Sequence, residues 1–251
     1  MKRTVLVTGG QRGIGLAVAQ ALQAAGFQVA ISSEHPDDSA EVTQALSSLP
    51  DAHHYSHDLN DVPGIPALLD RIEAKLGPVT TLVSNAGVPA RVRGDMLDVS
   101  TANFDFTLGI NLRGGFFLAQ DVARRMLARK SDTYQALVFV TSVSAEMVSP
   151  ERAEYCLSKA AAAMMAQLYA ARLAEAGIGV YDIRPGIIET PMTSGVRDTY
   201  TARIEDGLVP ARRWGQPKDI ASTLLPLVTG QMAFATGAVI PVDGGLSIQR
   251  L

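Results

Sequence analysis

The hydrophobic residues of the chain gather in short runs that alternate with longer segments of helical period. A helix that packs on one side repeats apolar residues every three or four positions, whereas a strand buried on both faces reads as a short continuous apolar run. The short runs predict strands over residues 4–8, 28–32, 80–84, 136–141, 179–183 and 238–242. Helical or loop-then-helix segments follow the first five. The alternation predicts an α/β fold with a doubly wound parallel sheet and helices on both faces.

No linker, repeat or low-complexity stretch divides the chain, so we expect residues 1–251 to form a single domain. Two segments, 87–96 and 190–217, lack a regular pattern and are rich in Gly, Pro, Thr and Arg. Ligands of open α/β sheets bind beyond the carboxyl ends of the strands, which both segments follow. We therefore expect these segments to form pocket walls, with a substrate loop or lid around 190–217.

The charge balance narrows the classes of partner. A formal net charge of −3, without a basic cluster, predicts no binding to nucleic acid or to a membrane surface. Residues 220–242 carry no charge, but prolines and glycines interrupt them, so no membrane span is expected. The single cysteine, Cys156, excludes an internal disulfide and fits a reducing cytoplasm. Because His53, His54 and His57 would place only two imidazoles on one face of a strand, we expect no metal site.

A glycine-rich turn, "TGGQRGIG" at residues 8–15, directly follows the first predicted strand and opens the first helix. At Gly9, Gly13 and Gly15 the missing side chains would permit a tight turn and a close approach of the backbone to a pyrophosphate. This context predicts a dinucleotide-binding site at the first turn.

The end of the second predicted strand bears on the choice of nucleotide. An Asp or Glu there would bind the ribose 2′-hydroxyl of NAD, but Ser33 occupies the place. Arg12 could pair with the 2′-phosphate of NADP, whereas Glu34 would repel that phosphate or itself bind the ribose hydroxyls. The balance favours NADP, with NAD as the alternative.

A tyrosine and a lysine, Tyr155 and Lys159, share one face of a helix because they lie four positions apart. A nearby ammonium stabilises a phenolate, so a phenol placed in this way can exchange a proton near neutral pH. Ser142, at the end of the strand over 136–141, could hold a substrate carbonyl beside that phenol. Asn111 is polar in an apolar helical segment and could be a satisfied core amide or part of a water relay to Lys159.

With these motifs in order, the chain resembles the short-chain dehydrogenase/reductase superfamily over nearly all of its length. The resemblance implies a single-domain Rossmann-type fold, no metal and a homotetramer. The stretches that carry it are "TGGQRGIG" at 8–15, "HDL" at 57–59, "SNAG" at 84–87, "IN" at 110–111, "TS" at 141–142, "YCLSK" at 155–159, "RPGIIETPM" at 184–192 and "VDGG" at 242–245. One departure is Ser84, where the family has a first Asn.

The resemblance implies roles for individual residues. Tyr155 would be the general acid/base and would also contact the cofactor. Lys159 would stabilise its phenolate and bind the nicotinamide ribose. Ser142 would orient the carbonyl, and Asn111 would complete a proton relay. Asp58 and Leu59 would contact adenine. The other residues expected to bind the cofactor are Gly9, Gln11, Arg12, Gly13, Ile14, Gly15, Ser33, Asn85, Ala86, Gly87, Pro185, Gly186, Ile188 and Thr190.

The expected function is an NAD(P)-dependent oxidoreductase that interconverts a small-molecule ketone and a secondary alcohol. The stretches 185–192 and 207–221 look most like the 3-oxoacyl-[acyl-carrier-protein] reductase branch. A sugar or polyol dehydrogenase of the same family is the alternative, since four arginines would suit a phosphopantetheine or a sugar acid equally: Arg91, Arg93, Arg212 and Arg213. A catalytically inactive nucleotide sensor is a hypothesis of another class.

Overall fold

The computed structural model describes residues 3–250, so residues 1, 2 and 251 of the predicted domain lie outside it. Its strands form one parallel sheet in the order β3-β2-β1-β4-β5-β6-β7. The strands are β1 (Thr4–Thr8), β2 (Gln28–Ser33), β3 (His53–Ser56), β4 (Val79–Ser84), β5 (Ala136–Val140), β6 (Gly179–Pro185) and β7 (Val239–Val242). The α-helices are α1 (Gly13–Ala24), α2 (Ala40–Ser47), α3 (Ile65–Leu76), α4 (Thr101–Leu108), α5 (Gly115–Leu127), α6 (Ala153–Leu173), α7 (Arg197–Glu205) and α8 (Pro217–Val228).

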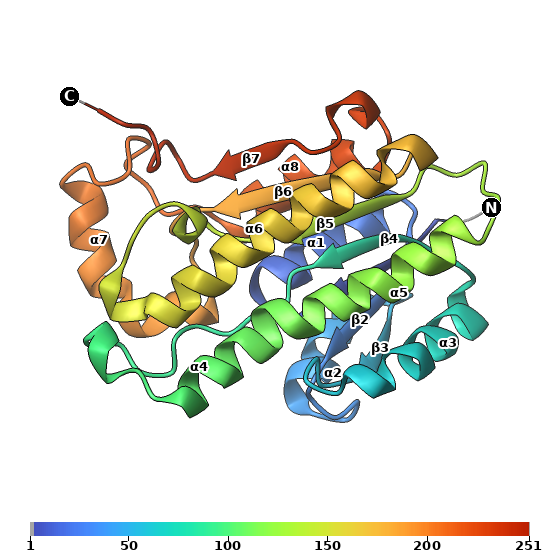
Figure 1. The fold of residues 1–251 in the computed structure, drawn as a ribbon, viewed down its shortest axis with the longest axis horizontal. Helices are drawn as coiled ribbons and strands as arrows, with labels where there is room; N and C mark the ends of the chain where they lie inside the picture. Colours follow the sequence, from blue (N-terminus) through green and yellow to red (C-terminus); the bar gives the residue numbers. More distant parts are fainter. Residues whose placement is uncertain (1–2, 251) are drawn as a thin grey trace.

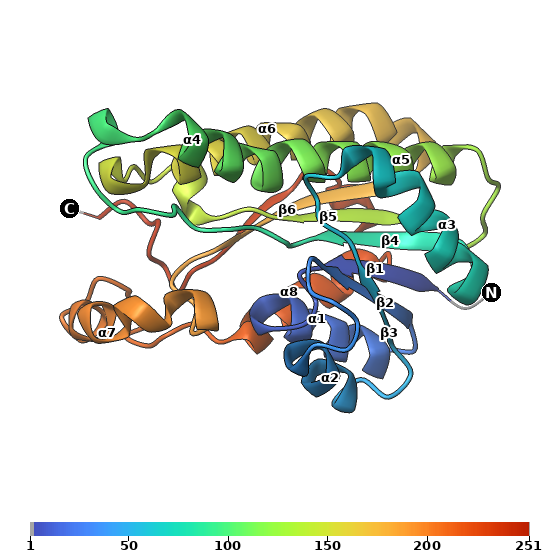
Figure 2. The ribbon, with the colours of Figure 1, turned by 90° about the horizontal axis from the view of Figure 1, so that it is seen from below.

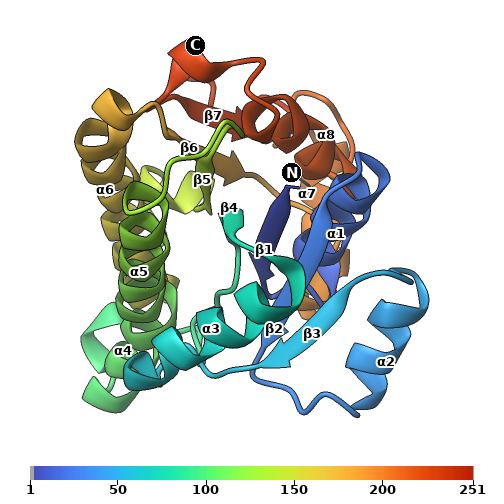
Figure 3. The same ribbon diagram turned by 90° about the vertical axis from the view of Figure 1, so that its right-hand side faces the viewer.

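Helices cover both faces of the sheet, which confirms the predicted α/β class. Helices α3, α4, α5 and α6 lie on one face, and α1, α2 and α8 lie on the other (Figures 1 and 2). Alternate residues of each strand enter the two cores: Leu6 packs with the α3, α5 and α6 side, whereas Val5 and Val7 pack with the α1 and α8 side. Figure 3 looks along the strands and shows the sheet between these layers.

The chain reverses its direction of travel across the sheet between β1 and β4. It moves outward from β1 to β2 and β3, then returns to place β4 on the other side of β1. Such a switch point opens a crevice at the carboxyl ends of the strands, where nucleotides bind in doubly wound folds. The glycine turn after β1 and the "SNAG" stretch at the end of β4 are therefore neighbours.

Two elements depart from the sequence expectation. Strand β3 was not among the predicted strands because only Tyr55 of its four residues is buried and no apolar run marks it. Helix α7 lies inside the segment 190–217, which was expected to be irregular. Only Ile204 of α7 is buried, so the helix lacks the apolar stripe that sequence patterns detect.

Candidate active site

A cavity of about 850 Å³ lies at the carboxyl ends of the strands, at the switch point. Most of the residues predicted to bind cofactor or substrate line it. Those lining residues are Gly9, Gln11, Arg12, Gly13, Ile14, Ser33, Asp58, Leu59, Asn85, Ala86, Gly87, Ser142, Tyr155, Lys159, Pro185, Gly186, Ile188 and Thr190. Gly15 and Asn111 lie outside the lining and act on the cavity through their neighbours.

The glycine turn has the geometry that its sequence predicted. Gly9 and Gly13 adopt positive φ angles of 65° and 54°, which favour glycine. A methyl group on Gly15 would lie 2.1 Å from the Gly9 carbonyl oxygen, so Gly15 lets α1 pack directly on the turn. The buried Gln11 side chain lines the cavity, and its Oε1 has no hydrogen-bond partner among the described residues. A bare backbone cradle with an unpartnered polar atom fits a bound dinucleotide.

The end of β1 is tied to the end of β4 by Thr8, a residue that the sequence reasoning missed. Its hydroxyl oxygen accepts hydrogen bonds from the amides of Asn85 and Ala86, both at 3.0 Å. The Asn85 side-chain amide donates in return to the Thr8 carbonyl at 2.9 Å. Thr8 is the first residue of the glycine motif, so its place in that motif could have identified it as a site residue.

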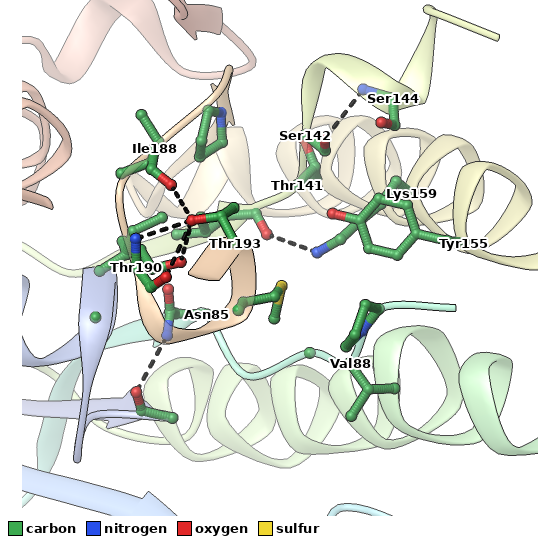
Figure 4. Close-up of a pocket in the computed structure, with 18 of the residues that line it drawn as sticks. Asn85, Val88, Thr141, Ser142, Ser144, Tyr155, Lys159, Ile188, Thr190 and Thr193 are labelled. Carbon is green, nitrogen blue, oxygen red and sulfur yellow. Dashed lines mark hydrogen bonds between the residues drawn. The ribbon is translucent and has the colours of Figure 1, made fainter. Parts of the chain in front are cut away.

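Tyr155, Lys159 and Ser142 lie together on one wall of the cavity, and their polar atoms face its interior (Figure 4). Helix α6 carries Tyr155 and Lys159, and the buried Lys159 Nζ donates to the Val140 carbonyl at the end of β5, at 3.2 Å. The Ser144 amide donates to Ser142 Oγ at 3.0 Å. Because that contact uses a lone pair, the Ser142 hydroxyl hydrogen remains available to a ligand.

Asn111 lies in a π-helical segment, Gly109–Gly114, between α4 and α5. Its Oδ1 accepts from the Val88 amide at 2.7 Å, and its Nδ2 donates to the Val88 carbonyl at 2.9 Å and to Ser158 Oγ at 3.0 Å. The Ser158 hydroxyl in turn donates to the Tyr155 carbonyl at 2.8 Å. Asn111 thus fixes both the loop after β4 and the first turn of α6, and Ser158 is a further residue that the motif reasoning did not single out.

The gap between Asn111 and Lys159 is kept open by Gly87. A methyl group on Gly87 would lie 3.1 Å from Asn111 Oδ1 and 3.5 Å from Lys159 Nζ. The amide oxygen and the ammonium therefore both face the position that a side chain of residue 87 would occupy.

The segment after β6 closes the opposite wall through a capping arrangement at Thr190. The Thr193 hydroxyl donates to the Ile188 carbonyl at 2.8 Å and accepts from the Thr190 amide at 3.0 Å (Figure 4). The spacing of the two threonines matches a capping box, which is the signal that could have identified Thr193. In α7, Tyr200 lines the cavity and its ring meets the Trp214 ring edge-on at 6.3 Å.

The arginines that were candidates for anion binding are distributed differently from the expectation. Arg93 lines the cavity, but Arg91, Arg212 and Arg213 do not. Arg91 lies over the Phe106 ring at 3.5 Å from its centroid, and Arg213 pairs with Asp219 at 2.7 Å. Two other arginines, Arg152 and Arg203, line the cavity.

The adenosine end of the cavity also differs from the expectation. Arg12, predicted to meet a 2′-phosphate, pairs with Glu41 of α2 at 3.4 Å. His35 lies between two carboxylates, 3.5 Å from Glu34 and 3.3 Å from Glu41. The positive charge of Arg12 is therefore partly compensated by Glu41, a contact that the sequence did not predict because the two residues are far apart in the chain.

Comparison with known proteins agrees with this geometry. A family model described as enoyl-(acyl carrier protein) reductase matches residues 9–247. The 3-oxoacyl-[acyl-carrier-protein] reductase MabA of Mycobacterium tuberculosis is 34% identical over 252 residues, which cover 99% of this chain and 94% of that protein. The chain belongs to the short-chain dehydrogenase/reductase family. It is an oxidoreductase, as the sequence predicted, and its family uses NAD or NADP.

Two further members of the family are informative about the cofactor. A crystal structure of a 3-oxoacyl-[acyl-carrier protein] reductase from Brucella melitensis in complex with NAD has a TM-score of 0.95 and 42% identity, and the match covers 100% of this chain and 99% of that one. An NADP-dependent (R)-specific alcohol dehydrogenase of Lentilactobacillus kefiri is 30% identical over 98% of this chain and 97% of its own length. Both nucleotides thus occur among similar proteins.

Residues 3–250 hold neither a metal cluster nor a membrane-spanning helix. Within this range no group of three or more His, Cys, Asp and Glu side chains is arranged to hold a metal ion. None of the helices described is long and apolar enough to cross a membrane.

Proposed function

We propose that this oxidoreductase reduces the 3-oxo group of an acyl thioester carried on phosphopantetheine, as a 3-oxoacyl-[acyl-carrier-protein] reductase. The observation that carries the proposal is the convergence of Tyr155, Lys159 and Ser142 on the wall of a cavity whose far end is a bare glycine cradle. The similar proteins with this name support the substrate class. The comparisons do not favour the sugar or polyol dehydrogenase or the inactive sensor.

The nicotinamide cofactor supplies the hydride when it is bound in the cavity. The Ser142 hydroxyl, with its oxygen already engaged by the Ser144 amide, donates a hydrogen bond to the substrate carbonyl oxygen. The Tyr155 hydroxyl gives its proton to the same oxygen, so the ketone becomes a secondary alcohol. Lys159, held by the Val140 carbonyl, stabilises the phenolate that remains on Tyr155.

Reprotonation of Tyr155 passes from solvent along the gap beside Gly87. We infer that water beside Gly87 carries this proton between Asn111 Oδ1 and Lys159 Nζ, since both atoms face the position that a side chain of residue 87 would occupy. Asn111 therefore serves the reaction as a positioning residue and as one end of this relay.

The test of the chemistry is a spectrophotometric assay that follows oxidation of the reduced nicotinamide with 3-oxoacyl thioesters, and reduction of the oxidised nicotinamide with sugars and polyols. Tyr155→Phe should reduce turnover by about 100-fold or more while leaving the Kd for the reduced cofactor unchanged. Tyr169→Phe is the matched control, because Tyr169 lies on the same helix and its hydroxyl donates to the Phe116 carbonyl at 2.9 Å, outside the cavity lining. Wild-type turnover in Tyr155→Phe would remove the phenol from the mechanism.

The phosphopantetheine phosphate would meet the exposed guanidinium groups of Arg93 and Arg203 at the cavity. Arg93→Gln and Arg203→Gln should raise KM for a phosphopantetheine thioester and leave kcat/KM for the N-acetylcysteamine thioester, which has no phosphate, unchanged. Arg213→Gln is the control, since Arg213 pairs with Asp219 and does not line the cavity. Equal effects on both thioesters would exclude phosphate recognition by these residues.

NAD is the cofactor that the adenosine end of the cavity supports. The prediction of NADP rested on Ser33 in place of an acid and on a free Arg12, and the Arg12 side chain pairs with Glu41. Glu34, which lines the cavity with a 62% exposed side chain, adds a negative charge that would repel a 2′-phosphate. The similar Brucella protein bound to NAD is consistent with this choice.

The expected homotetramer and cytoplasmic location stay proposals. The exposed apolar side chains of α6, Leu157, Met164 and Leu168, support a subunit interface on that helix. Sedimentation velocity would test the assembly, and a monomer at micromolar concentration would exclude it. The single cysteine supports a reducing compartment.

A further inference from the structure

A chain of three side chains lies behind the adenosine end of the cavity. Ser33 Oγ, at the end of β2, is 2.8 Å from His54 Nε2 on β3, and His54 Nδ1 is 2.6 Å from Asp37 Oδ1 in the loop that follows β2. Ser33 lines the cavity, whereas His54 and Asp37 do not. The His54 side chain is only 1% exposed, so it acts on the cavity through Ser33.

The order of protons along this chain follows from Asp37. Its carboxylate accepts hydrogen bonds only, and the same Oδ1 also accepts from the Ser56 amide at 3.1 Å. The neutral imidazole of His54 must therefore carry its hydrogen on Nδ1, which leaves Nε2 as an acceptor. Ser33 then donates its only hydroxyl hydrogen to His54. Its oxygen can offer lone pairs, but no hydrogen, to a ligand in the cavity.

The two nucleotides differ at the group that would meet Ser33. The ribose 2′-hydroxyl of NAD can donate a hydrogen bond to an acceptor oxygen, whereas the 2′-phosphate of NADP is an acceptor and an anion. The neighbouring groups act in the same direction, because Glu34 is negative and Arg12 is paired with Glu41. A Ser33 hydroxyl that offers no hydrogen would leave the 2′-phosphate of NADP without a hydrogen-bond donor at this position.

We propose that the Asp37–His54–Ser33 relay sets the cofactor preference by holding Ser33 as an acceptor for the 2′-hydroxyl, so that the protein prefers NAD(H) to NADP(H). The inference rests on the proposed function, since it assigns the nucleotide used at the same site. Ser33 touches the cofactor. His54 and Asp37 are positioning residues that decide which way the Ser33 hydrogen points.

The test is a fluorescence titration of NADH and NADPH into the nucleotide-free enzyme at about pH 8, where imidazoles are ordinarily neutral. The quantity compared is the ratio of the two Kd values. His54→Phe removes the acceptor and frees the Ser33 hydrogen to turn toward the cavity. This should shift the ratio about tenfold toward NADPH, the size expected for one hydrogen bond to a charged group.

Asp37→Ala tests the relay without changing the buried side chains. It removes the oxygen that holds the imidazole hydrogen on Nδ1, so His54 can carry its hydrogen on Nε2 and donate it to Ser33, which again frees the Ser33 hydrogen. The ratio should shift in the same direction as in His54→Phe. Asp37 is 65% exposed, so this variant carries the test if His54→Phe does not fold. Asp38→Asn, the adjacent exposed aspartate, measures the effect of lost charge alone.

Two further variants separate the relay from a structural role. His53→Phe changes the neighbouring residue of β3, on the opposite face, and should leave the ratio unchanged. In a Ser33→Ala background, His54→Phe should produce no further shift, because the relay then has no hydroxyl to orient.

The outcomes of these titrations test the relay and the proposed function separately. Tighter binding of NADH by the wild type, with a shift in His54→Phe and Asp37→Ala that Ser33→Ala abolishes, supports the relay. A wild-type preference for NADPH, an unchanged ratio, or a shift that persists without Ser33 overturns it while leaving the proposed function intact. Failure to bind either nucleotide overturns the proposed function, and the relay with it.

Discussion

A buried ion pair braces the strand end that carries Ser142. Asp182, in the middle of β6, is 2% exposed, and its Oδ2 accepts from Arg184 Nε at 2.8 Å. Its Oδ1 accepts from the hydroxyl of Thr141, the residue before Ser142. Burial lowers the pKa of Arg184, but hydrogen bonds to Asp182 and Glu146 offset this effect and raise the pKa above its usual value. The guanidinium therefore stays charged in the interior and depends on Asp182.

Removal of one partner of a buried pair leaves an uncompensated charge, which costs about 3–5 kcal/mol. Arg184 would keep its contact with Glu146, which offsets a part of this cost although the Glu146 side chain is 76% exposed and screened by water. We therefore expect Asp182→Leu to lower the free energy of unfolding by about 3 kcal/mol, near the lower limit of that range. This is a large share of the roughly 5–15 kcal/mol that stabilises a typical folded protein.

Urea unfolding followed by circular dichroism measures this loss, and a double-variant cycle identifies its cause. Replacement of both partners by apolar residues removes the unpaired charge. The free energy of unfolding of the double variant Asp182→Leu, Arg184→Met should therefore lie within about 1 kcal/mol of the wild-type value. A double variant as unstable as the sum of the two single variants would refute the reasoning, because the loss would then come from packing. Asp182→Asn, which keeps the side-chain shape, replaces Asp182→Leu if that variant does not fold.

Three other perturbations follow from particular contacts. Gly87→Ala should lower kcat by about 10- to 100-fold with little change in Tm, because the added methyl group would lie 3.1 Å from Asn111 Oδ1 and displace this end of the relay. An unchanged kcat would argue against the relay beside Gly87. Asn111→Leu should cost about 2 kcal/mol in urea unfolding, since it removes the hydrogen bonds to Val88 and Ser158, and a loss near zero would mean that those groups are satisfied by water. Burial raises the pKa of Glu73, but hydrogen bonds from Arg129, the Val79 amide and Arg125 lower it overall. The ionised carboxylate thus stabilises the fold above its unfolded pKa of about 4.3 and loses this effect as the pH falls through the lower folded pKa. The difference in free energy of unfolding between the wild type and Glu73→Gln should therefore narrow below about pH 4. A difference independent of pH would contradict the assignment.

Features carried by neighbouring residues could be predicted from the sequence. The glycine turn at Gly9 and Gly13, the pair formed by Tyr155 and Lys159, and the strand end at Ser142 each depend on residues a few positions apart. Apolar runs marked all the strands of the sheet except β3. A strand at the edge of a sheet buries little, and β3 has only Tyr55 to mark it.

Features that depend on contacts between distant segments could not be predicted. Arg12 was expected to be an unpaired cation because its partner, Glu41, lies far away in the sequence, on α2. The π-helical turn at Asn111 is set by packing: a methyl group on Gly114 would lie 2.3 Å from the Leu59 carbonyl oxygen, and nothing local in the sequence marks that approach. Asp182 was expected only as part of the strand over 179–183, and Arg184 only as the first residue of the stretch 184–192, although their pairing braces Thr141.

The two ends of the cavity are held by different kinds of contact, and this difference bears on how they can change. At the catalytic end, Lys159 and Ser142 bind backbone groups of Val140 and Ser144, which a substitution of the Val140 or Ser144 side chain does not remove. At the adenosine end, the state of Ser33 depends on the side chains of His54 and Asp37, which lie outside the cavity. A single substitution there can therefore alter the choice of nucleotide while the groups that transfer the proton stay in position. In a fold built in this way, the preference for NAD or NADP can change while the reduction of the ketone stays the same.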